Sequence, residues 1–225
     1  MKRIELIKLA GIILMVLAQI ITCVFTIANK SDLNRLQELV VSNMPENRNK
    51  DLINKLESIT SSEVYKTERG NFIIRHIAMS IKEEGRTGVP AYITLAQAIL
   101  ESNNGTSKLA AYSNNLFGIK CGIKDCSDRR HCMPFHSDSP KDRFRVYADV
   151  EESFKDHSNF LVVNSRYSEL FKLDIEDISG WCRGLKKCGY AGDPQYAIKL
   201  ENLIKRYSLL ELVKLTKKIG DARLP

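Results

Sequence analysis

The sequence has little of what marks fibrous, repetitive or unfolded chains. It holds only 12 glycines, 6 prolines and one tryptophan in 225 residues, and it contains neither an internal repeat nor a low-complexity tract. These absences exclude collagen-like, repeat-built and low-complexity proteins. A globular chain of this length is expected to form one domain of ordinary size with additional segments.

Two further absences narrow the possible partners. The formal net charge is +7, yet no cluster of lysine and arginine is interleaved with aromatic residues. An acidic partner is therefore expected, but nucleic acid is not; bacterial wall polymers and lipid head groups remain. The paired C-x2-C spacing of structural zinc sites is also missing, so we predict no metal and no cofactor. A zinc site, if one formed, would draw on Cys121, Cys126, Cys132, His131 and His136, whose spacing is only weakly typical of such a site.

The N-terminus contains one long hydrophobic segment. Residues 9–28 carry no charge and follow Lys2, Arg3 and Lys8. A membrane-spanning helix needs about 20 apolar residues, whereas the core of a signal peptide has about 7–15. We therefore predict a transmembrane helix over residues 1–28, with a cytoplasmic N-terminus and an exported body. Cleavage after Ala28, which would release a secreted protein, is the alternative.

The remaining chain divides into three parts. Residues 29–70 are polar with thinly spread apolar residues and are interpreted as a stalk or linker, and residues 208–225 as a basic tail. Residues 71–207 form the predicted domain, in which helical periodicity alternates with an irregular, β-prone stretch over 121–147. The expected fold class is mainly α (α+β), with a helical lobe, a small β-hairpin lobe and a cleft between them.

One predicted helix carries a polar stripe. Residues 91–101, AYITLAQAILE, are apolar nearly all round, which is typical of a buried helix. Its polar side chains Thr94, Gln97 and Glu101 share one side, so this side is expected to border the cleft. A carboxyl group buried among apolar groups keeps its proton near neutral pH, as the general acid of glycoside hydrolysis must. The alternative is that Glu101 only ends the helix and faces water.

Four motifs in order strengthen the interpretation of Glu101 as an acid. They are LAQAILESNNGTSKLA (95–110), SNNLFGIKC (113–121), FRVYADVEESFKDHSNFL (144–161) and GYAGDPQYAIKL (189–200). Together they resemble the bacterial glucosaminidase family, glycoside hydrolase family 73. The resemblance implies a lysozyme-like fold over roughly 71–207 and cleavage after N-acetylglucosamine in peptidoglycan. It also implies that Glu101, the Glu of the family's L-A-Q-x-x-x-E-S motif, is the catalytic acid.

The same resemblance suggests the other site residues. The stretch HSDSPKDRFRVY favours Asp138 as a second carboxylate, with Asp125, Asp128 and Asp142 as alternatives. Attack by the substrate's own N-acetyl group would require none of them. Tyr190 matches a tyrosine of the family's active site. The predicted substrate contacts are Gln97, Asn115, Phe117 and Tyr196.

Some alternatives stay open from the sequence. A muramidase or a lytic transglycosylase would use the same acid, and a wall-binding module would use none. Among the exported cysteines, we predict local disulfides between Cys126 and Cys132 and between Cys182 and Cys188. Cys121 would then stay free or pair in trans, unless it pairs with Cys182.

Overall fold

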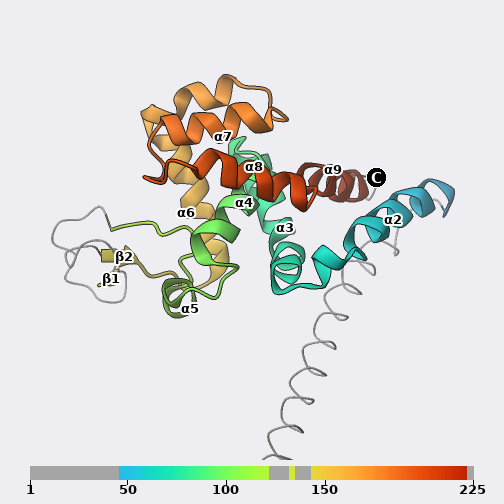
Figure 1. The fold of residues 1–225 in the computed structure, drawn as a ribbon, viewed down its shortest axis with the longest axis horizontal. Coiled ribbons are helices and arrows are strands. Elements are labelled where there is room, and N and C mark those ends of the chain that lie inside the picture. Colours follow the sequence, from blue (N-terminus) through green and yellow to red (C-terminus); the bar gives the residue numbers. More distant parts are fainter. Residues whose placement is uncertain (1–45, 122–131, 135–142, 222–225) are drawn as a thin grey trace, which may run out of the picture.

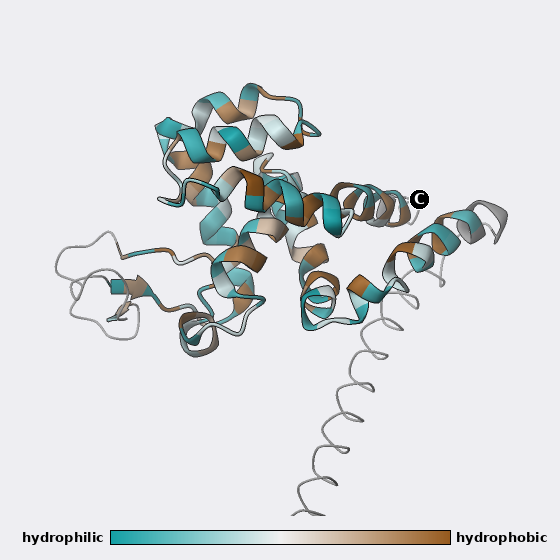
Figure 2. Ribbon diagram, in the orientation of Figure 1, coloured by the Kyte–Doolittle hydropathy of each residue, from teal (hydrophilic) through white to brown (hydrophobic). Residues whose placement is uncertain are grey.

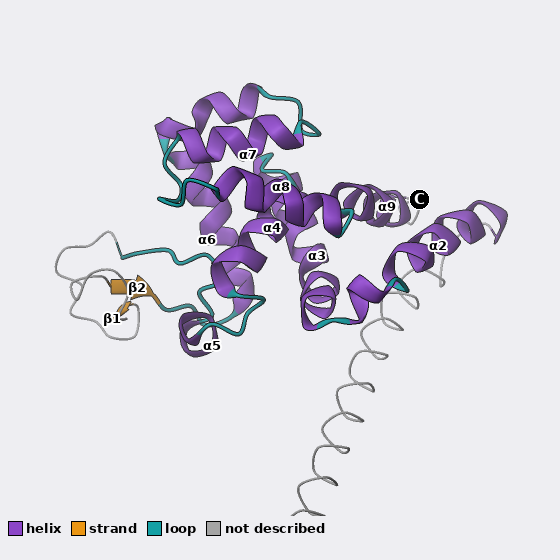
Figure 3. Ribbon diagram, in the orientation of Figure 1, coloured by secondary structure: helices purple, strands orange, loops and turns teal. Residues whose placement is uncertain are grey.

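The computed structural model describes residues 46–121, 132–134 and 143–221, and its elements are labelled in Figure 1. In chain order they are α2 (Glu46–Thr60), η1 (Glu63–Lys66), α3 (Glu68–Thr87), α4 (Ala91–Ser102), α5 (Lys108–Ser113), β1 (Cys132–Pro134), β2 (Arg143–Arg145), α6 (Val150–Val163), η2 (Ser165–Lys172), α7 (Ile178–Lys187), α8 (Tyr196–Arg206) and α9 (Leu209–Asp221). The prediction of a mainly helical fold with a small antiparallel hairpin is confirmed (Figure 3).

Helix α4 forms the centre of the core. It packs against α3, α8 and α9, and its residues from Ala91 to Ile99 are all buried. The surrounding helices alternate hydrophobic and hydrophilic residues (Figure 2), so each can bury one side against α4 or its neighbours. A buried helix of this kind holds its polar side chains in fixed surroundings, which matters for the site described below.

The hairpin lies beyond α5, at the opposite end of the molecule from α2 (Figure 1). Met133 of β1 pairs with Phe144 of β2, and Lys120 forms an antiparallel bridge to the same Phe144. A disulfide joins Cys121 to Cys132, whose Cα atoms are 6.3 Å apart. Our prediction that Cys132 pairs with Cys126 and leaves Cys121 free is therefore wrong.

The predicted bridge between Cys182 and Cys188 is also wrong, because both thiols are free. Cys182 is buried inside α7, while Cys188 caps the end of that helix and its Sγ lies 3.0 Å from the carbonyl oxygen of Arg166. Six residues of helix turn the chain by about 600° and rise about 9 Å, which points the two side chains in different directions. The alternative pairing of Cys121 with Cys182 is excluded by the same disulfide. Cys126 lies outside the described residues.

The ends of the domain are more structured than expected. Leu56 of α2 and Tyr65 of η1 belong to the core, and the Tyr65 hydroxyl donates to the carbonyl of Tyr207. Residues 209–221, predicted as part of a basic tail, form α9 with a buried side. The buried residues of α9 are Leu209, Leu212, Val213, Leu215 and Ile219. These residues recur at helical spacing among the lysines, so the core includes α9.

The predicted transmembrane segment, residues 9–28, lies outside the described residues. Within the part of the chain that the structure describes, we find no helix with the length and apolar character needed to cross a membrane.

Candidate active site

Glu101 lies in the last turn of α4, and the end of that helix is firmly closed. Asn103 and Asn104 adopt left-handed backbone conformations, and both of their N–H groups donate to the carbonyl of Ile99. The Ser102 hydroxyl donates to the carbonyl of Ala98 at 2.5 Å and accepts from the N–H of Gly105 at 2.7 Å. These bonds satisfy the terminal groups of the helix and fix the backbone that carries Glu101.

The surroundings of Glu101 favour its protonated form. Burial raises the pKa of this carboxyl, and a hydrogen bond from Tyr196 opposes part of that increase. The negative end of the α4 dipole acts in the same direction as burial. Glu101 Oε1 is buried and has no hydrogen-bond partner among the described residues. Burial and this unpartnered oxygen both disfavour the charged form of the carboxyl group.

Tyr190 lies beside this carboxyl. Gly189, with a φ of 72°, turns the chain after α7, and the Tyr190 N–H then donates to the carbonyl of Leu185. The Tyr190 ring stacks on that of Tyr196, with centroids 5.8 Å apart. Its hydroxyl is buried without a partner in the described part of the chain. Burial and the negative charge of Glu101 raise the pKa of Tyr190, which keeps its proton.

Behind Glu101, three buried side chains form a continuous set of hydrogen bonds. Gln97 Nε2 donates to the Tyr196 hydroxyl at 3.0 Å, and Gln97 Oε1 lies 3.1 Å from His157 Nε2. Gln97 and His157 are 0% exposed and Tyr196 is 2% exposed. Burial lowers the pKa of His157 to about 3, so the ring is neutral. Sequence reasoning missed His157, although it follows Phe154 and precedes Leu161 on the apolar side of α6.

Two of the predicted substrate contacts lie in the interior. The Asn115 amide donates to the carbonyls of Ile119 and Arg145, and thereby ties the segment after α5 to β2. Phe117 is 3% exposed and stacks on the His157 ring, with centroids 4.0 Å apart. Gln97 and Tyr196 are likewise buried. Contact of these four residues with a sugar stays a prediction.

The predicted second carboxylate, Asp138, lies outside the described residues, as do its alternatives Asp125, Asp128 and Asp142. Over residues 46–121, 132–134 and 143–221, no three His, Cys, Asp or Glu side chains converge as metal ligands would. The structure thus brings together Glu101, Tyr190, Tyr196 and Gln97 from the predicted set.

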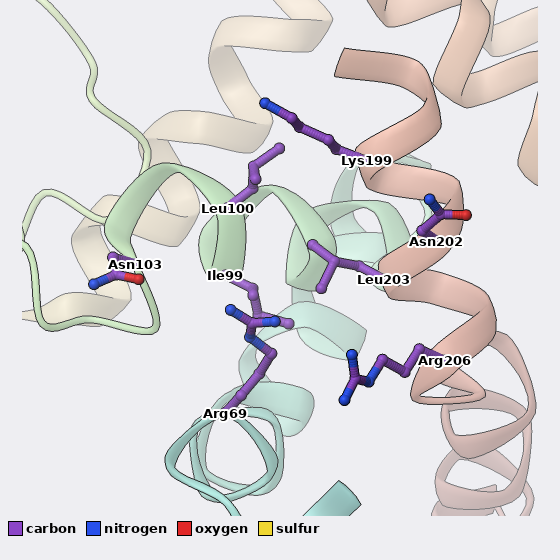
Figure 4. Close-up of a pocket in the computed structure, with 8 residues that line it drawn as sticks. All are labelled: Arg69, Ile99, Leu100, Asn103, Lys199, Asn202, Leu203 and Arg206. Atoms are coloured by element: carbon purple, nitrogen blue, oxygen red, sulfur yellow. The ribbon is translucent and has the colours of Figure 1, made fainter. Parts of the chain in front are cut away.

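The other side of α4 borders a different environment (Figure 4). A pocket of about 310 Å³ lies there between the start of α3, the end of α4 and α8. Arg69, Lys199 and Arg206 supply its charge, over a floor that includes Ile99. Since two helical residues turn by about 200°, Ile99 and Glu101 point to nearly opposite sides of α4.

Comparison with known proteins assigns this arrangement to a known family. Residues 77–209 match the family model described as mannosyl-glycoprotein endo-beta-N-acetylglucosaminidase. The matched range runs from α3 to the start of α9 and includes every described residue of the site.

Similar curated proteins are cell-wall enzymes by name. The exo-glucosaminidase LytG of Bacillus subtilis is 33% identical over 130 residues, which cover 53% of this chain and 44% of LytG. The peptidoglycan hydrolase FlgJ of Vibrio cholerae is 30% identical over 182 residues, covering 75% of this chain and 54% of FlgJ. The chain thus spans about half the length of these relatives.

Solved structures show the same fold. The catalytic domain of the autolysin Auto from Listeria monocytogenes superposes with a TM-score of 0.53 at 27% identity, covering 65% of this chain and 88% of that domain. The glycoside hydrolase domain of FlgJ from Salmonella typhimurium gives a TM-score of 0.51 at 27% identity, covering 70% of this chain and the whole of that domain.

Proposed function

Since the chain belongs to the mannosyl-glycoprotein endo-beta-N-acetylglucosaminidase family, we propose that it is a peptidoglycan hydrolase. It cleaves the glycan strand after N-acetylglucosamine, as an endo-acting enzyme, with Glu101 as the general acid. Its family membership and the names of its relatives support the choice of substrate.

The state of Glu101 is the observation that carries this proposal. Its carboxyl group combines a pKa raised by burial with one oxygen that has no partner among the described residues. A carboxyl group whose pKa is raised keeps its proton to higher pH than an exposed one, which suits it to donate that proton to a leaving group. A glutamate that only ended a helix would instead be solvated and ionised.

The reaction follows from this arrangement. Glu101 protonates the glycosidic oxygen, which keeps the electron pair of the breaking C–O bond. Either the N-acetyl oxygen of the substrate or a carboxylate such as Asp138 stabilises the anomeric carbon from the opposite side. Water then adds hydroxide to that carbon and returns a proton to Glu101. The Tyr190 hydroxyl, which stays protonated beside the carboxyl, orients the N-acetyl group or the water.

Digestion of purified sacculi tests the proposal. The products are reduced with borohydride, which labels each newly formed reducing end, and are then identified by mass spectrometry. N-acetylglucosamine ends support the proposal, whereas reducing or anhydro muramic ends would identify a muramidase or a lytic transglycosylase. Binding to sacculi without release of fragments would indicate that the chain is a wall-binding module and not an enzyme.

The size of the products tests the endo-acting mode. An endo-acting enzyme releases fragments of several lengths early in the digestion, while an exo-acting enzyme shortens strands from one end. Because LytG is named an exo-glucosaminidase, the early length distribution is the direct comparison. Accumulation of the smallest fragment alone from the first time point would contradict endo-cleavage.

The proposal also places the domain outside the cytoplasmic membrane, anchored by residues 9–28. The apolar length of that segment and the basic residues before it support an uncleaved anchor. Membrane fractionation of the full chain tests this. Retention in membranes after carbonate washing supports the anchor, while a soluble product that begins at Asn29 would show cleavage after Ala28.

A further inference from the structure

The hydrogen bonds behind Glu101 have a definite direction. A neutral imidazole has one N–H, and His157 Nδ1 is buried with no partner in the described chain, so the proton belongs on Nε2. His157 Nε2 therefore donates to Gln97 Oε1, and the Gln97 NH2 group faces Tyr196. The Tyr196 oxygen accepts from Gln97, so its own O–H is free to donate to Glu101.

From this direction we propose that Gln97 and His157 are positioning residues that act on Glu101 through Tyr196. They hold the Tyr196 O–H toward the Glu101 carboxyl group, so that Tyr196 donates to the acid and accepts from Gln97. The inference rests on the proposed function of Glu101 as general acid.

The arrangement favours the chemistry at the moment of transfer. When Glu101 gives its proton to the glycosidic oxygen, the carboxyl group becomes negative. The Tyr196 O–H already points at the carboxyl group and stabilises that charge without reorientation. If the Gln97 amide were reversed, Tyr196 would donate to Gln97, and its oxygen lone pair would face the new carboxylate.

The local sequence fixes the positions of His157, Gln97 and Tyr196, the three side chains that form this hydrogen-bond relay. Gln97 and Glu101 are separated by four residues on α4, so they lie on the same side of the helix. Phe117 stacks on the His157 ring and limits its rotation. Asp193 accepts from the N–H groups of Gln195 and Tyr196, and so fixes the start of α8.

The pH dependence of turnover reports on this relay. Among the described residues, the titratable groups that interact with Glu101 are Tyr196 of α8 and Tyr190 of the α7–α8 turn, while Tyr147 and Tyr167 interact in turn with Tyr190. Of these, Tyr196 lowers the pKa of Glu101 through its hydrogen bond. Loss of that bond should move the basic limb of the kcat profile to higher pH and lower kcat about tenfold.

A double-mutant cycle separates positioning from packing. Gln97→Leu and Tyr196→Phe are each expected to lower kcat and shift the basic limb upward, with the smaller change for Gln97→Leu and an unchanged KM for both. The double variant is expected to match Tyr196→Phe alone, because Gln97 acts only through Tyr196. Additive losses, or a raised KM with an unmoved pH profile, would overturn the proposal.

Thr94→Val is the matched control, since Thr94 is buried one turn earlier on α4 and, in the described part of the chain, its hydroxyl donates to the carbonyl of Pro90. It should leave kcat and the pH profile unchanged. If the wild-type protein releases no fragments from sacculi, the proposed function fails. If it releases them but the Gln97→Leu profile equals that of wild type, only the relay fails.

A measurement on the unmodified protein covers the case in which a variant does not fold. The ring ¹⁵N shifts of His157 are expected to report a proton on Nε2 and none on Nδ1, unchanged from pH 8 to pH 5. A charged ring within that range, or a proton on Nδ1, would contradict the direction of the relay.

Discussion

The two sides of α4 show how differently polar groups are stabilised in this domain. On one side, Gln97 is buried and Glu101 is half-buried, and the relay bonds allow only one orientation of the Gln97 amide. On the other, Arg69, Lys199 and Arg206 border a pocket (Figure 4), and the side chains of Lys199 and Arg206 are exposed. Removing the partner of a buried polar group destabilises the fold by the full desolvation cost of that group, whereas an exposed charge that loses its partner changes the free energy of unfolding little. Substitutions should therefore have large effects on the first side and small effects on the second.

The largest effect is expected for Glu101→Gln. The amide has nearly the same shape but cannot supply the proton, so activity on sacculi should fall by roughly 10²–10⁴-fold. Turnover by the purified variant, measured as released reducing ends, checks this. Glu169→Gln, at an exposed ion pair with Lys172, is the control and should retain activity. Activity within about threefold of wild type would remove Glu101 from the mechanism.

The same variant should be more stable than wild type at neutral pH. The folded-state pKa of Glu101 is raised, so its contribution to stability is present below the pKa of the unfolded chain and is lost as pH rises through the folded pKa. Glutamine avoids that loss because it never ionises. The melting temperature of Glu101→Gln should exceed that of wild type at pH 8 and approach it at pH 4. A lower melting temperature at pH 8 would show that the carboxylate is stabilised by groups outside the described chain.

The buried histidine of the relay predicts acid sensitivity. The unfolded chain binds a proton at a histidine near pH 6.5, but the folded protein does not protonate His157 until about pH 3. Because the unfolded state then binds more protons, the free energy of unfolding falls as pH drops below 6.5, by about 2 kcal/mol at pH 5 from this residue. His76, whose pKa burial lowers to about 4, adds to the effect. Urea unfolding at pH 7.5 and pH 5 measures the difference, and equal midpoints would mean that His157 is charged in the fold.

The disulfide should have a moderate effect. Cys121 and Cys132 close a loop with a sequence separation of 11, and opening it is expected to cost about 2–3 kcal/mol. The combined Cys121→Ser and Cys132→Ser variant should melt at lower temperature, and peptide mapping without reduction should recover the two cysteines linked. Recovery of Cys132 linked to Cys126 would contradict the structure.

As a comparison, burial raises the pKa of Cys182 to about 12, so this thiol should react with iodoacetamide only after unfolding.

The sequence predicts local structure, including the helix that carries Glu101, better than it predicts contacts between elements. Apolar periodicity is visible along the chain, so α4, α6 and the stripe that ends in Glu101 could be predicted from it. The disulfide depends on which strands pair, and the relay depends on which side of α6 meets α4; neither is encoded in spacing along the chain. Helix α9 was missed because its lysines conceal a stripe formed by Leu209, Leu212 and Val213.

The smallest effect is expected on the pocket side of α4. The Arg206 side chain is exposed, and its described contact is the Tyr207 ring, with the guanidinium 6.0 Å from the ring centroid. Arg206→Gln should therefore change the free energy of unfolding by less than about 0.5 kcal/mol and leave kcat unchanged. Arg86→Gln is the contrast, because Arg86 donates to the buried Glu83 and to Asn159, and its loss should destabilise the fold more. A tenfold loss of activity in Arg206→Gln, with stability unchanged, would break the comparison by showing that the pocket side of α4 also contacts the substrate.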